Sequence, residues 1–545
     1  MEKKYVLILG AGLMQRPSFE AAKELGFNVL AVDANPDAVC VPFADWFERI
    51  DLKDRQKLAE FALCQKEKIA GVFTAGTDFS ASVSYVAEKC GFKAHSFEAA
   101  VNASDKIKMR TCFKAMNVSS PDFIQIERSH IASFLKPEIL NSMTFPKVVK
   151  PVDNMGARGC RLIRNKDEFL PAVEDAARNS RSGRAILEDY MEGPEFSIDA
   201  IVYEGTLTIT GFADRHIFYP PYFIEMGHTM PSLVDEGKKL ELIRTFAKGI
   251  SALGLTSGVA KADIKYTSKG PMIGEIAARL SGGYMSGWTY PYASSLNLTK
   301  TAMQIALGLE PDELLKKRQT LNIDDCDFKI YEVSCTKVSA ERAWISIPGK
   351  IHKVYNADKA SCVPFVKNMF FRSRKGSSVC FPRNNVEKCG NVISLAPENK
   401  LAVEAAQKSV SSLVLRLEKN NSATQEFLLG TCRKSEKSFP PDAFKLNNEQ
   451  TKALLTFAES NPIFPKDSSA QDFFPEQLVQ STSLVFDYNY RNIKETFKIF
   501  DTICPLHPAL ETKSFVKALI RGGIQGILYI ADSKTKKTKR RFSFR

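Results

Sequence analysis

The first 33 residues have the pattern of a strand, a helix and a second strand. An apolar run at residues 5–9 ends in the glycine-containing turn 10–12, an amphipathic helix pattern follows, and the apolar run 29–32 closes on Asp33. Two short apolar runs joined by a helix predict a βαβ unit with parallel strands. We therefore expect residues 1–103 to form an open parallel α/β domain, in which ligands bind at the carboxyl ends of the strands.

Chain length and composition narrow the class of protein. A chain of 545 residues is too long for one hydrophobic core, so several structural units are expected. Hydrophobic residues make up 44% and charged residues 25%, which excludes a disordered or fibrous protein. The twelve cysteines include no Cys-x-x-Cys pair, so neither a disulfide framework nor a zinc finger is indicated. No apolar run approaches the roughly 18 residues of a membrane span, so we expect a cytoplasmic protein without membrane contact.

The net charge of +13 does not by itself predict a nucleic acid partner. Seven of the positive residues lie in the last twelve positions of the chain, 534–545. Without this basic tail the excess is about half as large, which is too little for the body of the protein to bind a polynucleotide. The tail itself is typical of a solvated chain end.

The remaining sequence predicts three further regions: one of α+β character, a smaller α/β module and an extension to which no fold class is assigned. Strands and helices alternate irregularly up to about residue 325, and a smaller α/β module follows that ends in a helix over residues 400–417. Composition changes after about residue 420, where Pro440-Pro441 and a Ser/Phe/Pro-rich stretch indicate a boundary. The expected regions are 104–325 with a mobile lid at about 140–200, a C-terminal module at 326–420, and an extension of unknown role at 421–545.

The predicted hairpin of residues 258–276 carries the strongest candidate site. Asp263 and Glu275 lie on its two strands, so both carboxylates can project from one face towards a shared cation. Carboxylate oxygens are the ligands that Mg²⁺ takes when it also bridges nucleotide phosphates. Arg279 and the turn Ser281-Gly282-Gly283 follow, and they offer a permanent positive charge and backbone N–H groups to anionic oxygens.

A second group of residues suits the binding of nucleotide phosphates. Lys150 ends an apolar strand just before a loop that contains Gly156, Arg158 and Gly159. A flexible glycine loop can close over phosphates through its backbone amides, with one buried amine beside it. Lys106, on the preceding segment, could supply another positive charge.

The segment from Glu188 to Glu195 suits the base and ribose of a nucleotide. Glu188, Asp189 and Met191 close a strand and open a connector, where backbone groups can read the edge of an adenine ring. Glu195 could accept hydrogen bonds from ribose hydroxyls. Each of these acidic residues, taken alone, is typical of an exposed surface.

Taken in order, these residues resemble the ATP-grasp superfamily, and the resemblance covers about residues 1–420. The motifs that carry it are SDK with Lys106, VVKP with Lys150, the loop DNMGARG, the hinge LEDYMEGPE, VAKADIKY with Asp263 and GEIAARLSGG with Glu275. The resemblance implies a ligase that uses ATP and Mg²⁺ (or Mn²⁺) to activate a carboxylate as an acyl phosphate. It places Lys106, Lys150 and the glycine loop on the phosphates, the hinge on adenine and ribose, and the metal on Asp263 and Glu275.

Within the superfamily, the stretch PPYFIEMGHTMPS is similar to that of the amino-acid ligase branch, and the chain has no Met-Lys-Met biotinylation sequence. The resemblance implies small-molecule carboxylate and amine substrates. It gives Arg279 a catalytic role on the transferred phosphate or a substrate carboxylate, and it places His228 beside the acceptor site. One departure is Ala277, which stands where the family often has an Asn ligand for its second metal.

Two other functions fit parts of the sequence. A nicotinamide-dependent dehydrogenase would use the turn 10–12 and Asp33, but Gln15 replaces the third glycine of that fingerprint and the hairpin stays unexplained. A catalytically weak nucleotide-binding scaffold would be consistent with Ala277. The oligomeric state is open, with a homodimer as one alternative.

Overall fold

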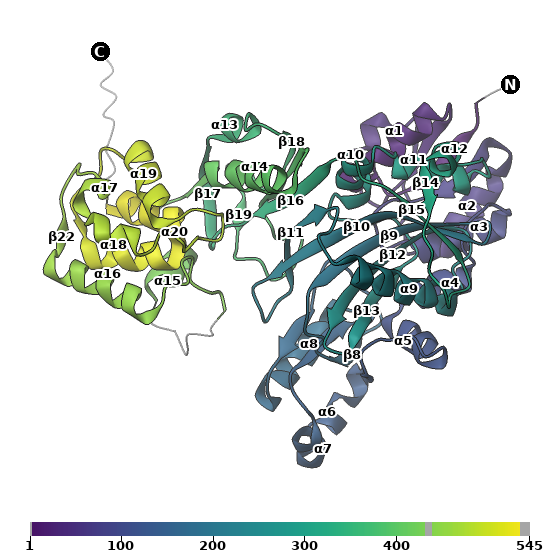
Figure 1. Ribbon diagram of the computed structural model, residues 1–545, viewed down its shortest axis with the longest axis horizontal. Coiled ribbons are helices and arrows are strands. Elements are labelled where there is room, and N and C mark those ends of the chain that lie inside the picture. The colour runs from purple at the N-terminus through teal and green to yellow at the C-terminus, as the bar shows by residue number, and fades with distance from the viewer. Residues whose placement is uncertain (1–2, 431–438, 535–545) are drawn as a thin grey trace. The chain divides into compact units, whose positions relative to one another are not determined.

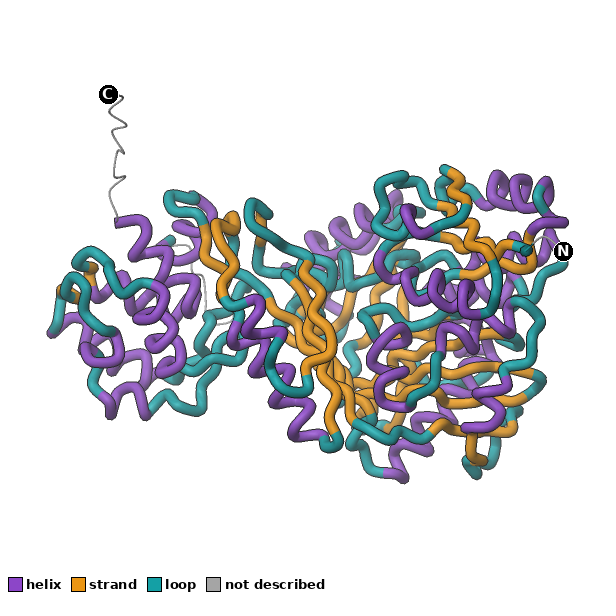
Figure 2. The backbone as a smooth tube through the Cα atoms, turned by 90° about the horizontal axis from the view of Figure 1, so that it is seen from above, coloured by secondary structure: helices purple, strands orange, loops and turns teal. Residues whose placement is uncertain are grey.

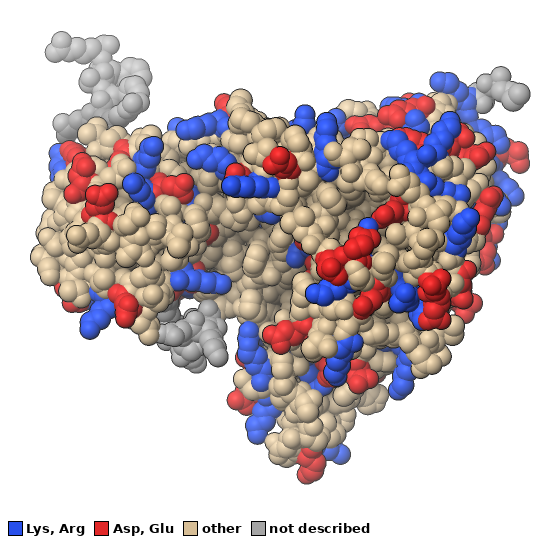
Figure 3. Space-filling model, in the orientation of Figure 1, with Lys and Arg blue, Asp and Glu red and all other residues tan. Residues whose placement is uncertain are grey.

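A computed structural model of the chain describes residues 3–430 and 439–534. The basic tail lies outside the described residues, apart from Lys534. Within the described ranges, no helix is both long enough and apolar enough to span a membrane. On the face drawn in Figure 3, acidic and basic side chains are intermixed. The chain divides into two compact units: residues 1–217, 221–340 and 395–402 form the first, and residues 218–220, 341–394 and 403–545 form the second.

The N-terminal domain contains an open parallel sheet in the strand order β3-β2-β1-β4. Alternate residues of β1 face opposite sides: Leu7 packs towards α2 and α3, whereas Ile8 packs towards α1 and α11. Burial on both faces explains the uninterrupted apolar runs of the sequence and confirms the predicted parallel α/β domain. The elements are β1 (Tyr5–Leu9), α1 (Arg16–Glu24), β2 (Asn28–Val32), β3 (Trp46–Glu48), α2 (Arg55–Cys64), β4 (Ile69–Phe73), α3 (Ser80–Cys90) and α4 (Phe97–Ser104).

A larger, mainly antiparallel sheet in the first unit has the order β13-β12-β9-β10-β11, with β15 parallel to β10 and β14 beside β15. Helix α9 lies against β12 and β13 (Figure 1), and its Phe246 and Ile250 share one core with Ile264 and Ile276 of these strands. The strands are β9 (Glu195–Tyr203), β10 (Thr206–Phe218), β11 (Ile224–Met230), β12 (Gly258–Thr267), β13 (Gly270–Ala277), β14 (Arg318–Thr320) and β15 (Lys329–Val333). The helices are α5 (Lys106–Ala115), α9 (Glu236–Leu253), α10 (Tyr290–Ser294), α11 (Leu298–Ala306) and α12 (Asp312–Lys317).

A separate four-stranded sheet in the order β5-β8-β6-β7 contains most of the residues predicted as the lid, but it begins earlier, with β5 at Phe123, and β9 lies in the larger sheet. Helix α8 covers it, and its Phe169 and Val173 share a core with Val149 and Leu187 of the strands. The lid therefore has a hydrophobic core of its own. Its elements are β5 (Phe123–Glu127), α6 (Ile131–Phe134), α7 (Pro137–Ser142), β6 (Lys147–Pro151), β7 (Arg161–Ile163), α8 (Phe169–Asn179) and β8 (Arg184–Asp189).

The second unit begins with strands and continues into the mostly helical segment after residue 421 (Figure 2). The mixed part contains β16 (Val338–Trp344), β17 (Gly349–Tyr355), α13 (Ala357–Ser361), β18 (Val366–Phe371), β19 (Ser378–Val379), β20 (Gly390–Ala396), α14 (Asn399–Ser412) and β21 (Val414–Leu417). The helical part contains α15 (Ser422–Leu429), α16 (Asn448–Ser460), β22 (Ile463–Phe464), α17 (Ala470–Phe473), α18 (Glu476–Gln480), α19 (Ile493–Ile503), β23 (Leu510–Glu511) and α20 (Thr512–Lys534).

Buried polar side chains tie the helical segment to the mixed part of the second unit. Asn489 exchanges two hydrogen bonds with the backbone of Ile345, at 3.0 and 3.1 Å. Gln525 accepts from Ile347 N at 3.3 Å and donates to Ser346 Oγ at 2.8 Å. Because these partners are buried together, the segment after residue 421 packs as a continuation of the module before it.

Helix α14 ends at Ser412, so the helix predicted over residues 400–417 is too long. Residues 414–417 instead form β21, which pairs antiparallel with β17. The fully buried guanidinium of Arg491 donates to Ser411 O at 2.9 Å and also contacts Leu413 O. A distant arginine therefore satisfies carbonyls at the end of this helix, which no local sequence pattern could predict.

Replacing Arg491 with Met is expected to lower the free energy of unfolding by about 2 kcal/mol, because buried carbonyl groups lose a charged donor. Urea denaturation of the full chain would measure the change. Lys494→Met, at an exposed position nearby, is the control and should change it by less than about 0.5 kcal/mol. Equal effects of the two substitutions would contradict this role of Arg491.

Candidate active site

Asp263 and Glu275 lie directly opposite each other on the neighbouring strands β12 and β13. The strands form an antiparallel hairpin whose turn includes Gly270, with a φ of +88° that suits glycine. Directly opposed residues of two paired strands project their side chains from the same face of the sheet. The hairpin therefore presents both carboxylates on one face.

Glu275 is held ionised by the cations around it. Its side chain is 33% exposed, and Lys106 Nζ lies 3.5 Å from Glu275 Oε1. Burial alone would raise the pKa of the Glu275 carboxyl, but four nearby cations outweigh this effect and lower the pKa to about 2. These cations are Lys106, Lys261, Arg279 and Lys150. An ionised, partly accessible carboxylate fits a hard cation such as Mg²⁺.

Asp263 is surrounded by charges that the sequence did not single out. Arg215 Nη1 lies 2.6 Å from Asp263 Oδ1, and Lys261 contacts Asp263 Oδ2. The same guanidinium pairs with Glu195 at 2.6 Å and with Glu225. Burial would lower the pKa of Arg215, but the three carboxylates raise it well above its ordinary value. Arg215 is therefore a fixed positive charge beside Asp263.

Lys150 and Glu188 belong to a buried ion network with Arg110. Lys150 Nζ lies 2.6 Å from Glu188 Oε2, and Arg110 Nη2 lies 2.8 Å from Glu188 Oε1. Arg110 also donates to Gly274 O at 2.6 Å, so it connects the lid strand β8 to β13 next to Glu275. The sequence reasoning overlooked Arg110, although its spacing of four from Lys106 places both on one face of α5.

Lys106 connects the hairpin to the glycine loop. Its ammonium group donates to Asn154 O at 3.1 Å and faces Glu275. Gly156 and Gly159 both have positive φ, of +70° and +67°, and a Cβ at Gly159 would lie 2.8 Å from Asn179 Cβ. Arg158 between them is partly exposed. Lys106, Lys150 and the loop thus lie around the carboxylate of Glu275.

The predicted adenine hinge is linked to β12 by a lysine that the sequence did not single out. Lys265 Nζ donates to Met191 O at 3.1 Å and lies 3.5 Å from Glu195 Oε2. It also lies 5.2 Å from the centre of the Tyr190 ring. The backbone N–H of Asp189 donates to Asp122 O within the lid region. Met191 and Glu195 therefore lie on the same edge of the site as Asp263.

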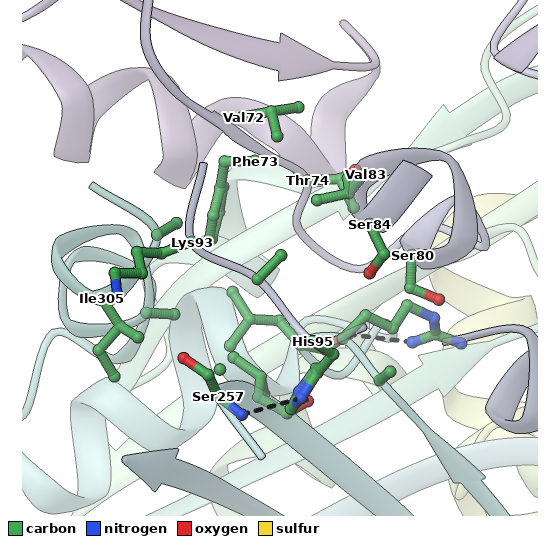
Figure 4. A pocket seen from close by; sticks show the side chains of 18 residues that line it. Val72, Phe73, Thr74, Ser80, Val83, Ser84, Lys93, His95, Ser257 and Ile305 are labelled. Atoms are coloured by element: carbon green, nitrogen blue, oxygen red, sulfur yellow. Dashed lines mark hydrogen bonds between the residues drawn. The ribbon is translucent and has the colours of Figure 1, made fainter. Parts of the chain in front are cut away.

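Arg279 lines a pocket of about 60 Å³ between the N-terminal domain and β12 (Figure 4). Its Nη1 donates to Leu280 O at 3.0 Å. His95, also in the wall, accepts from Ser257 N at 3.2 Å and makes a 2.9 Å hydrogen bond to Val259 O. Burial lowers the pKa of His95 to about 4, so its ring is neutral at physiological pH. Apolar residues of β4, α3 and α11 form part of the remaining wall.

The turn after Arg279 is held by Asp199, another residue that the sequence reasoning missed. Ser281 donates to Asp199 through its hydroxyl and through its backbone N–H, the latter at 3.3 Å. The turn approaches the N-terminal domain closely, because a Cβ at Gly76 would lie 2.8 Å from Ser281 O. Burial raises the pKa of Asp199 to about 7, although the Ser281 hydrogen bonds and Lys261 act in the opposite direction.

The melting temperature of the Asp199→Asn protein, compared with that of the unsubstituted chain, is expected to increase as pH rises from about 4 to about 7. In the folded chain Asp199 keeps its proton up to about pH 7, whereas an unfolded Asp loses it near 3.8. The stabilisation from this proton is therefore complete below pH 3.8 and is lost as pH rises through 7, while Asn does not titrate. Melting temperatures measured across this range test the point, with the exposed Asp167→Asn as control. A difference in melting temperature between the two proteins that stays constant across this pH range would contradict the proposed protonation of Asp199.

His228 is fully buried, and its Nε2 lies 2.7 Å from Thr289 Oγ1. Tyr290 is also buried, and a Cβ at Gly211 would lie 2.6 Å from its ring, so it packs against β10. Trp288 lines a small hollow beside Gly76. His228 lies on strand β11, where a ring nitrogen and a carboxylate oxygen of Glu225, an ion-pair partner of Arg215, lie within 4.8 Å of each other.

The residues that a dinucleotide would need are engaged within the N-terminal domain. Asp33 accepts from Ala11 N at 2.8 Å and from Asn35 N at 2.9 Å. Gln15, at the third glycine position, donates to Thr74 Oγ1 at 3.1 Å. Asp33 therefore holds the loop that follows β1 in place through its hydrogen bond with Ala11.

Two domain models match parts of this chain, and several known proteins are distantly similar to it. Residues 143–287 match the ATP-grasp domain, and residues 343–418 match the L-amino acid ligase C-terminal domain 2. An uncharacterized protein, y4rH of Sinorhizobium fredii, is 22% identical over 76% of this chain and 83% of its own length. Carnosine synthase 1 of Gallus gallus is 24% identical over 57% of this chain, which spans only 36% of that protein.

Solved structures share the fold. The L-amino acid ligase from Bacillus licheniformis aligns over 77% of this chain and all of that chain, with a TM-score of 0.64 and 18% identity. At this identity the likeness concerns the fold alone. The two domain matches cover both the hairpin with its carboxylates and the module that follows the first unit. The chain therefore contains an ATP-grasp domain over residues 143–287, followed by an L-amino acid ligase C-terminal domain 2 over residues 343–418.

Proposed function

We propose that this protein uses ATP to activate a small carboxylate as an acyl phosphate and then joins it to an amine, with release of ADP and phosphate. The observation that carries the proposal is the opposed pair Asp263 and Glu275, surrounded by Lys106, Lys150 and Lys261. Ionised carboxylates among several fixed cations suit a nucleotide polyphosphate bound with a divalent metal.

The nucleotide would lie between the lid and the hairpin. Lys106, Lys150 and the backbone around Gly156 would bind the phosphates, and the hinge at residues 188–191 would take the adenine. Glu195 would accept from the ribose. Asp263 and Glu275 fit Mg²⁺ or Mn²⁺ because both offer hard oxygen donors on one face. When bound, the metal would neutralise phosphate oxygens during transfer.

The reaction would proceed in two steps. An oxygen of the substrate carboxylate attacks the γ-phosphorus of ATP, and the bond from that phosphorus to the bridging oxygen of ADP breaks. The amine nitrogen then attacks the acyl carbon, phosphate leaves, and the nitrogen loses a proton. Arg279 would stabilise the transferred phosphoryl group or orient the carboxylate, and the lid would exclude water from the acyl phosphate.

Amino acids and related metabolites are the substrates that we propose. The C-terminal domain match and the L-amino acid ligase and carnosine synthase relatives support this class. The role proposed for His228 is to lie beside the amine, and its buried ring makes a hydrogen bond with Thr289 and lies close to Glu225. We expect the protein to act in the cytoplasm, where its eleven described free cysteines would stay reduced.

The test is a screen for ADP and phosphate release by the full chain with ATP, Mg²⁺ and paired pools of carboxylates and amines. We expect release that requires both members of a pair. Failure of every pair to exceed background, although an ATP analogue binds, would favour the scaffold function. Tight NAD(H) binding without ATP affinity would favour the dehydrogenase function.

A further inference from the structure

The hairpin offers fewer metal ligands than two cations require. Asp263 and Glu275 are opposed, but the residue two positions after Glu275 is Ala277, whose buried methyl group provides no oxygen donor. Two divalent cations bound side by side share carboxylate bridges and usually need a further protein oxygen. The donor set of the hairpin therefore fits one cation better than two.

Asp263 is already neutralised by the protein. Arg215 Nη1 lies 2.6 Å from its Oδ1, and Lys261 contacts its Oδ2. Both cationic side chains are only 9% exposed. The Arg215 guanidinium is fixed by further pairs with Glu195 and Glu225, so its removal from Asp263 would leave buried charges uncompensated.

The Glu275 carboxylate is more exposed than the Asp263 carboxylate, and a metal ion can bind only a carboxylate that it can reach. Its side chain is 33% exposed, against 19% for Asp263, and its ion pair with Lys106 is longer, at 3.5 Å, than the 2.6 Å pair of Asp263 with Arg215. Fixed cations thus contact both oxygens of Asp263, whereas Glu275 is the more exposed of the two carboxylates.

We infer that this site takes one divalent cation with the nucleotide, held chiefly by Glu275 at the more exposed end of the pair, and that Arg215 and Lys261, paired with Asp263, provide the positive charge that a second cation would bring. The inference rests on the proposed function, because it concerns the same nucleotide site. Permanently charged side chains in a fixed arrangement can stabilise phosphate charge in place of a metal. The number of bound metal ions is therefore set by Ala277 and Arg215.

Electron paramagnetic resonance of Mn²⁺ tests the inference without any turnover. The full chain is titrated with Mn²⁺ in the presence of a non-hydrolysable ATP analogue, and ions bound by the free analogue are subtracted. We expect one Mn²⁺ per chain and no spin coupling between ions. Two bound ions with a coupled spectrum in the unsubstituted chain would overturn the inference.

Two substitutions should restore the second ion. Ala277→Asn adds an oxygen donor beside Glu275, and Arg215→Met frees Asp263. We expect the double variant to bind two Mn²⁺ with a coupled spectrum. If Arg215→Met does not fold, the Ala277→Asn single variant is titrated in its place, with the same expected result. The exposed Arg178→Met is the matched control and should bind one ion. A folded double variant that binds only one ion would also overturn the inference. Absence of analogue binding in the unsubstituted chain would instead reject the proposed function.

Discussion

Replacing Glu275 with Gln is expected to lower kcat by about 1000-fold, equivalent to about 4 kcal/mol of lost transition-state stabilisation. The substitution keeps the shape of the side chain but removes the negative charge that would hold the metal. Lys106 and Lys150 stay in place, so the affinity for ATP should change by less than about fivefold. Steady-state kinetics and equilibrium binding of an ATP analogue would measure the two effects separately.

The control for Glu275 is Glu67→Gln, which makes the same chemical change at an exposed position in the N-terminal domain. It should leave both kcat and ATP affinity unchanged. Full activity of the Glu275→Gln protein would remove Glu275 from the metal site. Loss of activity with an equal loss of analogue binding would mean that the residue acts in binding alone.

Lys150→Ala is expected to raise the Kd for ATP by about 100-fold, or about 2.7 kcal/mol, with a smaller effect on kcat. The amine would lose its contact with the phosphates, and Glu188 would keep Arg110 as its remaining ion-pair partner. Attraction of Glu188 raises the pKa of Lys150 despite the opposing effect of burial, so the amine is charged throughout the physiological range. Isothermal calorimetry with an ATP analogue would measure the change.

The control for Lys150 is Lys166→Ala, an exposed lysine of the lid. Its removal should change the Kd by less than about twofold, because exposed charges in water interact weakly with a ligand. A large fall in kcat with unchanged Kd in Lys150→Ala would contradict the binding role. It would indicate instead that Lys150 acts on the transferred phosphate.

Local patterns predicted the parts of the fold whose cause is local. The apolar runs at residues 5–9 and 29–32 became β1 and β2 of a parallel sheet, buried on both faces. The short turn at Gly270 brought Asp263 opposite Glu275, because a hairpin joins residues that are close in sequence. The helix end after Ser412 was missed, since the arginine that satisfies its carbonyls comes from position 491.

The same limit explains which charged residues the sequence could not identify. Arg215 is surrounded by carboxylates from three different strands, and only the order of those strands brings them together. Asp199 looks like one polar residue in an apolar strand until the turn at Ser281 packs on it. Arg110 was predictable in part, because helical spacing relates it to Lys106, but its partners on β8 and β13 were not.

Transfer of ¹⁸O from a labelled carboxylate substrate tests the central claim most directly. Once the screen has found a substrate pair, the carboxylate is labelled with ¹⁸O and the phosphate released with ADP is analysed by mass spectrometry. Formation of an acyl phosphate predicts that one ¹⁸O atom appears in each phosphate, because a carboxylate oxygen becomes part of it. Unlabelled phosphate, or release of AMP and pyrophosphate, would contradict the mechanism proposed for this protein.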